Sequence, residues 1–237
     1  MNNNLEFNDG VYVNDNAVSK SFVSNVFAYM ALALAISGAL AYLFGTTDLI
    51  LSLVTRSGMT TLGWVVMFAP FAFILAMNFG FNKMSFTTLL AVFLGYAAVM
   101  GISLSFIFLV YDLGIITKVF FITAGLFGAM AFIGYTTKTD LTKFGGILMM
   151  AVIGIVIASV VNMFMKSSQM DYIISCVGVL VFTGLTAYDV QKIKRIGAGV
   201  EFGTAEASKL ALMGALSLYL DFVNLFMFLL RVFARRD

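Results

Sequence analysis

The stretch "LSLYLDFVNLFMFLLR", from Leu216 to Arg231, decides how this chain folds and what it is expected to do. Fifteen residues that would otherwise form a membrane helix contain one full charge, Asp221, near their middle. Placing an aspartate at the centre of a membrane helix costs about 2.5–3.5 kcal/mol on insertion scales. Asp221 is therefore expected to face a helix interface or an aqueous cavity, and not lipid.

The composition of the whole chain agrees with a membrane location for this stretch. Apolar residues make up 61% of the 237 residues and charged residues 11%, and the mean hydropathy is +1.01. A soluble domain is roughly 25% charged and 45–50% apolar. The sequence therefore predicts a polytopic membrane protein, and its hydrophobic runs leave no room for a separate aqueous domain.

Seven hydrophobic segments are long enough to span a bilayer, which takes about 20 apolar residues. They lie near residues 22–44, 59–79, 86–110, 118–136, 145–165, 171–190 and 211–233. All are expected to be helices, because they are too long for barrel strands and lipid offers the backbone no hydrogen-bond partners. Residues 1–21 are predicted to be a polar cytoplasmic tail without the basic region of a signal peptide, and residues 22–237 a seven-helix transmembrane domain.

The basic residues predict the orientation of these helices. The N-terminal side collects eight of them: Lys20, Lys83, Lys138, Lys143, Lys192, Lys194, Arg195 and Lys209. The opposite side has six: Arg56, Lys118, Lys166, Arg231, Arg235 and Arg236. Because cytoplasmic loops are enriched in Lys and Arg, the N-terminus is expected inside. A last segment that dipped in and returned would strengthen this bias, but its length favours full crossing.

Several kinds of site are excluded by composition. The chain has one cysteine, Cys176, and no histidine, so it lacks an intramolecular disulfide and the commonest metal ligand. The net charge of +2, without a basic cluster interleaved with aromatic residues, does not favour nucleic acid as a partner. No cofactor is expected. Any response to pH must come from carboxylates.

Only one other acid lies clearly inside a hydrophobic span. Asp189, in "VLVFTGLTAYDVQKIKR", lies about seven residues before the expected end of the sixth helix, or roughly 10 Å along it. Asp221 lies ten residues into the seventh helix, or roughly 15 Å from the same side. Because consecutive membrane helices are antiparallel, the two carboxylates are expected to meet at a similar depth.

Such a pair has a specific chemistry. Two carboxylates close together in a low dielectric cannot both ionise easily, so they are expected to share a proton. When both are ionised, they repel each other or admit a cation, and calcium prefers carboxylate oxygens. The pair is thus predicted to sense pH and to bind calcium transiently. Supporting polar residues are expected among Tyr188, Tyr219, Asn224 and Asn78.

Each acid also has a purely structural interpretation. Asp189 precedes the basic cluster of Lys192, Lys194 and Arg195, so it could pair with Lys192 at the membrane boundary. Asp221 could form hydrogen bonds with neighbours such as Tyr219 or Asn224. A pair of acids at one level argues for function more strongly than either residue alone.

Two motifs resemble a known family. "TGLTAYDVQKIK" (Thr183–Lys194) together with "ALSLYLDFVNLFMFLLR" (Ala215–Arg231) is similar to the transmembrane Bax-inhibitor-motif family, and most similar to its bacterial members. The combination of A-Y-D-x-x-x-I-K with L-Y-L-D-F-x-N-L-F is specific, although both motifs lie in the last quarter of the chain. The segment count extends the resemblance over nearly the whole chain.

The resemblance implies a fold in which the last of seven helices is central and the other six surround it. It also implies a pH-sensitive calcium leak in a bacterial inner membrane, gated by the aspartates that match Asp189 and Asp221. Some relatives carry a basic residue late in the second helix that could latch the acidic pair. Here that region reads "LAMNFGFNKMS" (Leu75–Ser85), with Lys83 alone beyond the helix, so a basic latch is not expected.

Three other functions compete with a leak. A membrane adaptor would act by binding other membrane proteins, such as a quality-control protease to which some bacterial relatives are linked. A proton-coupled transporter is disfavoured because no internal repeat is evident. An intramembrane aspartyl protease would place Gly-x-Gly-Asp at Asp221, where this chain has "LYLD", and would need a Pro-Ala-Leu element, whereas Pro70 precedes Phe71. The protein is therefore expected not to be an enzyme.

Overall fold

A computed structural model describes residues 15–56, 58–201 and 203–234. Within these residues seven helices are long and apolar enough to cross a membrane, as the sequence predicts. They are α1 (Asp15–Thr46), α2 (Thr61–Gly80), α3 (Phe86–Leu104), α4 (Leu113–Thr136), α5 (Thr142–Met165), α6 (Ser168–Gly199) and α7 (Ala205–Ala234). Two short 3-10 helices, η1 (Asp48–Ser52) and η2 (Ser105–Leu109), follow α1 and α3. Strands β1 (Val54–Thr55) and β2 (Gly58–Met59) pair antiparallel before α2.

Short polar residues start several of the helices. The hydroxyls of Thr60, Ser85, Ser167 and Thr204 accept hydrogen bonds from backbone N–H groups in the first turns of α2, α3, α6 and α7. Ser, Thr, Asp and Asn are favoured at this position because they satisfy donors that have no partner within the helix. The turn between α5 and α6 consists of Lys166, with φ of 50°, and Ser167. Short polar residues in the connections thus mark where these four helices begin.

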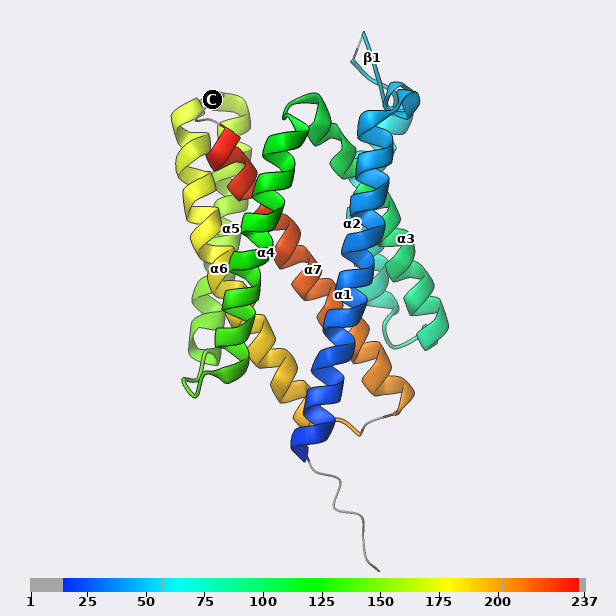
Figure 1. The fold of residues 1–237 in the computed structure, drawn as a ribbon, viewed down its shortest axis with the longest axis vertical. Helices are drawn as coiled ribbons and strands as arrows, with labels where there is room; N and C mark the ends of the chain where they lie inside the picture. Colours follow the sequence, from blue (N-terminus) through cyan, green and yellow to red (C-terminus); the bar gives the residue numbers. More distant parts are fainter. Residues whose placement is uncertain (1–14, 57, 202, 235–237) are drawn as a thin grey trace, which may run out of the picture.

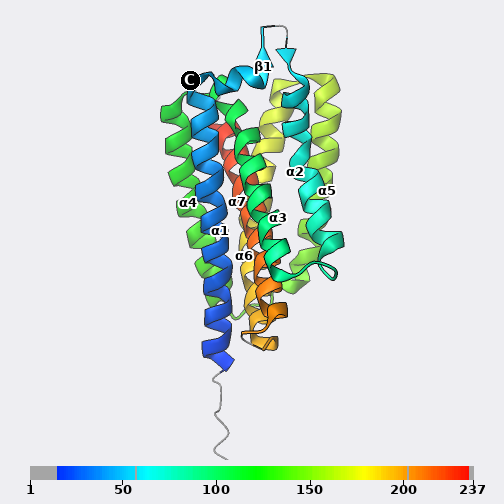
Figure 2. The same cartoon turned by 90° about the vertical axis from the view of Figure 1, so that its right-hand side faces the viewer.

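Helix α7 is the core of the bundle. It packs against α1, α3, α4 and α6, while α2 packs mainly on α3 and α5 on α6 (Figures 1 and 2). Aromatic side chains fill the contact with α4, where Phe222 lies 5.5 Å from Phe127 and 5.6 Å from Phe120 between ring centroids. The predicted central position of the last helix is confirmed, with four of the six other helices in its main contacts.

Helix α7 also runs the full length of the bundle. It starts at the end where α1 starts and finishes at the end where α1 finishes (Figure 1). At that far end Arg231 of α7 lies 3.8 Å from the carboxylate of Asp171, the acid in the first turn of α6. The last segment is therefore one continuous helix along the whole bundle, long and apolar enough for the complete crossing that the sequence predicts.

The largest differences between the observed and the predicted helix ends lie at two places. Helix α1 begins at Asp15 and not near residue 22, so part of the predicted tail 1–21 is helical; residues 1–14 lie outside the described residues. The predicted long connection 191–210 is mostly helix, because α6 continues to Gly199 and α7 begins at Ala205. Gly197 lies inside α6, and a Cβ there would lie 2.8 Å from the ring of Phe22. That glycine serves close packing with α1.

Small residues bring two other helix pairs into backbone contact. A Cβ on Gly101 of α3 would lie 2.5 Å from the carbonyl oxygen of Ser37 in α1. A Cβ on Gly134 of α4 would likewise collide with the carbonyl oxygen of Ala187 in α6. Small residues at helix contacts let backbones approach closely in membranes, where burying apolar surface gives no driving force between helices.

Replacing Gly101 with alanine is expected to destabilise the protein by about 1–3 kcal/mol, because backbone atoms of α1 must move to admit the methyl group. The measurement is the thermal unfolding midpoint of purified protein in detergent. Gly128→Ala in α4 is the matched control, since a Cβ there meets nothing within 4 Å and should be neutral or stabilise by up to about 1 kcal/mol. Equal midpoints for the two variants would refute the close contact.

Candidate functional site

Asp221 lies in the middle of α7, inside the protein. Its side chain is 5% exposed, and Oδ2 has no hydrogen-bond partner in the part of the chain that the structure describes. A buried polar atom without a partner costs about 1–3 kcal/mol, and more when it is charged. The structure thus confirms that Asp221 avoids lipid and leaves one of its oxygens available to a proton, a water molecule or a cation.

Asp189 lies on the neighbouring helix α6 and is half-buried. The contact between α6 and α7 is the most extensive between helices of the bundle. The two acids lie on the two helices that form this contact. The structure therefore brings the two predicted acids to one interface.

Two glycine contacts fix the relative level of the acids. A Cβ on Gly178 of α6 would lie 2.6 Å from the ring of Phe228 in α7, and one on Gly214 of α7 would lie 3.3 Å from the side chain of Ile193 in α6. Counting residues between these two points places the acids about one helical turn apart, or about 5 Å along the helices. The depths predicted from sequence differ by a similar amount.

Basic side chains leave the pair without a fixed counter-ion. Lys192, three residues after Asp189 in α6, is exposed. Within residues 15–56, 58–201 and 203–234, however, the ion pairs shorter than 4.0 Å are Arg195–Asp140 and Arg231–Asp171. The structure thus does not bear out the interpretation of Asp189 as half of a boundary ion pair with Lys192.

Tyr219, expected to support the acids, belongs to a different cluster. Its hydroxyl lies 2.7 Å from the hydroxyl of Ser37 in α1, and Ser37 donates to the carbonyl oxygen of Ala97 in α3 at 2.7 Å. Because Ser37 has a single proton, Tyr219 is the donor in their contact. The ring of Tyr96 packs edge-on to that of Tyr219, with centroids 5.4 Å apart. Tyr219 therefore ties α7 to α1 and α3 instead of contacting Asp221.

The other three predicted supporting residues also have separate roles. The side-chain amides of Asn224 and Asn78 donate to carbonyl oxygens one turn earlier in their own helices, those of Leu220 and Ile74. Asn78 is exposed on the outer helix α2, so its predicted place beside the acids is wrong. Tyr188 packs against α5, where a Cβ on Gly145 would lie 2.6 Å from its hydroxyl.

The described residues contain no group of three or more His, Cys, Asp or Glu side chains that could hold a metal ion. Two carboxylates can supply only part of the six to eight oxygen ligands that calcium takes. Carbonyl oxygens or water would have to complete its shell. The arrangement therefore fits brief occupation by a cation or a shared proton better than a permanent metal centre.

A polar cluster at the N-terminal end of the bundle was not singled out from the sequence. The buried amide of Gln191 in α6 accepts from Leu141 N at 2.9 Å and donates to Thr139 O at 2.8 Å. It thereby holds the connection between α4 and α5 against α6. A lone glutamine within a basic stretch is a weak signal, because polar residues at helix ends are usually solvated.

Comparisons with known proteins cover nearly the whole chain. Residues 19–237 match the sequence model of the family described as "Inhibitor of apoptosis-promoting Bax1". The inner membrane protein YbhL of Escherichia coli K12 is 38% identical over 218 residues, covering 92% of both chains. A protein of Borreliella burgdorferi is 41% identical, covering 92% of this chain and 94% of its own. A membrane protein of Streptococcus pyogenes is 32% identical over 96% of this chain and 98% of its own.

Tyr219→Phe is expected to destabilise the protein by about 0.6 kcal/mol, the average for a hydrogen bond between membrane helices, and by at most about 1.7 kcal/mol. The loss arises because the hydroxyl of Ser37 no longer receives a donor. Thermal unfolding in detergent provides the measurement. Tyr42→Phe, at an exposed tyrosine of α1, is the control and should leave the midpoint unchanged. A Tyr219→Phe midpoint equal to wild type would contradict the contact.

The Asp140 carboxylate, outside the spans, accepts from the hydroxyl of Thr142 and then from Arg195, and these contacts hold its pKa well below the usual range. A carboxyl group whose pKa is lower in the folded than in the unfolded protein stabilises the fold at any pH above its unfolded-state pKa. This stabilisation is lost as the pH falls through the folded-state pKa. The difference in unfolding midpoint between wild type and Asp140→Asn should therefore stay constant from roughly pH 8 to roughly pH 5. It should shrink only under more acidic conditions. A difference that vanished near neutral pH would refute this.

Proposed function

This chain belongs to the Bax inhibitor family of membrane proteins, and we propose that it is a calcium-permeable leak whose opening is controlled by protons. The observation that carries the proposal is the buried carboxylate of Asp221, which has an oxygen without a partner in the described residues and lies on the helix that packs most extensively against α6, the helix of Asp189. The proposed role is transport of an ion and involves no enzymatic step.

The protonated pair corresponds to the closed state. One carboxyl group donates a hydrogen bond to the other, directly or through water, and this interaction joins α6 to α7. A shared proton also removes a negative charge from the interior of the bundle. The electrostatic attraction between the pair and a calcium ion is then weaker.

The ionised pair corresponds to the conducting state. Two negative charges at one interface repel each other and attract a divalent cation from water. The described residues offer no lysine or arginine within ion-pair distance that could replace that cation. Flux is therefore expected to rise as pH rises.

The orientation and the membrane are further parts of the proposal. The eight basic residues on the N-terminal side favour a cytoplasmic N-terminus. The relatives are bacterial, and the Escherichia coli protein is an inner membrane protein. We place this chain in the inner membrane of a bacterium, where external calcium would reach the pair from the end of the bundle that holds Arg231.

Asp221→Asn is expected to abolish pH-dependent calcium flux, because an amide cannot release a proton and does not attract a cation. The measurement is calcium entry into liposomes that contain purified protein, followed with an encapsulated indicator from roughly pH 8 to roughly pH 5. Asp189→Asn should act in the same direction. Asp48→Asn removes an exposed carboxylate far from the pair and should leave the pH profile intact.

Three results would overturn the proposal. A pH profile that survived in both Asp189→Asn and Asp221→Asn would show that another group senses protons. Purified wild-type protein without flux, but with partners recovered from native membranes, would favour a membrane adaptor. Saturable exchange driven by a proton gradient would favour a transporter.

A further inference from the structure

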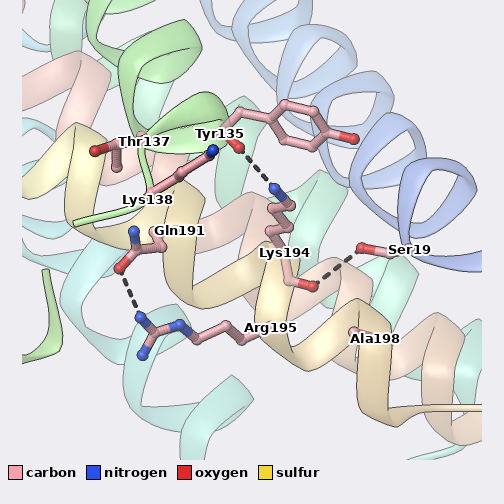
Figure 3. Close-up of a pocket in the computed structure, with 9 residues that line it drawn as sticks. Ser19, Tyr135, Thr137, Lys138, Gln191, Lys194, Arg195 and Ala198 are labelled. Atoms are coloured by element: carbon pink, nitrogen blue, oxygen red, sulfur yellow. Dashed lines mark hydrogen bonds between the residues drawn. The ribbon is translucent and has the colours of Figure 1, made fainter. Parts of the chain in front are cut away.

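A basic pocket opens at the N-terminal end of the bundle, and neither Asp189 nor Asp221 lines it. It has a volume of about 270 Å³ and lies between the start of α1, the end of α4 and the last turns of α6 (Figure 3). Its charged lining residues are Lys138, Lys194 and Arg195, and no acid lines it among the described residues. The nearest carboxylate in contact with this lining, Asp140, is bound to Arg195 at 2.6 Å.

The cations of the pocket differ in how far they are already engaged. Arg195 is fixed, since its guanidinium donates to Thr142, Asp140 and Gln191. Lys194 donates one of its three protons to the carbonyl oxygen of Tyr135 at 2.8 Å, which also caps the last turn of α4. The ammonium group also lies over the ring of Tyr135, 4.7 Å from its centroid, so only part of this group is left for a ligand.

Lys138 is the free cation. It is exposed, and it has no ion pair or hydrogen bond in the part of the chain that the structure describes. Lys138 and Lys194 both line the pocket (Figure 3). Two ammonium groups that line one small pocket repel each other unless an anion lies between them.

The polar groups of the pocket add further donors. Thr137 accepts a hydrogen bond from Thr139 N at 3.2 Å, so the proton of its own hydroxyl is free. Ser19 is already committed, because its hydroxyl donates to the carbonyl oxygen of Lys194, while the amide of Gln191 donates one of its two protons to the carbonyl oxygen of Thr139. The free donors are therefore on Thr137, Lys138, Lys194 and Gln191, which together suit an anion with several oxygen acceptors.

The pocket lies at the end of an apolar helix surface. It adjoins the last turns of α4, and just before it the same helix exposes Phe132, with 69% of its surface accessible, and Ile133. Apolar side chains so exposed on a membrane helix face acyl chains. Basic pockets between transmembrane helices on the cytoplasmic side recognise anionic headgroups.

We propose that this pocket binds a phosphate group, supplied by the headgroup of an anionic phospholipid whose acyl chains lie along the outer face of α4. The volume is below the roughly 300–1,000 Å³ of pockets that enclose whole drug-sized ligands, which suits a headgroup with its chains outside. The same chemistry would also accept free phosphate, so the test separates the two sources.

The experiment titrates purified full-length protein in detergent with short-chain phosphatidylglycerol, with phosphatidylcholine of the same chains, and with inorganic phosphate. The shift in thermal unfolding midpoint gives an apparent Kd for each. Phosphatidylglycerol should bind more tightly than either of the other two. Lys138→Gln should weaken it about five-fold, the effect of one basic residue at an anionic surface, and Lys138→Arg should retain it.

Lys143→Gln is the matched control. Lys143 is an exposed basic residue at the same end of the bundle, but it does not line the pocket. Equal weakening by Lys143→Gln and Lys138→Gln would show diffuse surface charge and overturn the site, as would wild-type affinity in Lys138→Gln. Equal binding of the two lipids would assign the effect to acyl chains and also overturn it. If inorganic phosphate matched phosphatidylglycerol and lost the same affinity in Lys138→Gln, the phosphate site would stand and the lipid source would be wrong.

Discussion

The constraint on which this structure depends is the burial of Asp221 without a protein partner for one of its oxygens. A bilayer offers no water to satisfy such a group, so the helices around it must shield it. Helix α7 is accordingly the most enclosed helix of the bundle. Its most extensive contact is with α6, the helix that carries Asp189. The outer helices α2 and α5, which have no such group in the middle of the membrane, remain largely exposed to lipid.

Holding α7 in the centre requires specific contacts as well as enclosure. Apolar contacts alone discriminate poorly between helix partners in a membrane, since lipid chains are equally apolar. The Tyr219–Ser37–Ala97 hydrogen bonds join α7, α1 and α3, while Gly101 and Gly134 allow the α1–α3 and α4–α6 pairs to approach. These contacts surround the acids without satisfying them. On α7, Tyr219 therefore contributes to stability, whereas Asp221 serves the proposed function.

The sequence predicted the helices and the two acids for the same reason, which is the cost of polar groups in lipid. Long apolar runs and two charges within them are unambiguous signals. The helix ends were less predictable. A glycine such as Gly197 commonly ends a helix, but here it lies inside α6 and has the small size that packing against Phe22 requires. A single sequence does not reveal which of these two uses of glycine applies.

The supporting residues show a second limit of sequence reasoning. Tyr219 precedes Asp221 by two residues, which corresponds to nearly opposite faces of a helix with 3.6 residues per turn. Helical spacing could have excluded a direct contact. Its true partner, Ser37, lies 182 positions away, and nothing in the local sequence "SGALA" distinguishes a buried hydrogen-bond partner from a small packing residue.

Under the proposed function, the absence of a fixed counter-ion couples protons to calcium. Each uncompensated carboxylate in the membrane costs about 2.5–3.5 kcal/mol on insertion scales, so the doubly ionised pair is disfavoured unless a cation accompanies it. Losing the shared proton and gaining a cation are then linked events. Linkage is reciprocal in equilibrium binding: if protons expel calcium from the pair, calcium must expel protons with the same coupling free energy. A basic residue placed beside Asp221 would break this coupling by supplying a permanent counter-ion, which gives the missing basic latch a physical meaning.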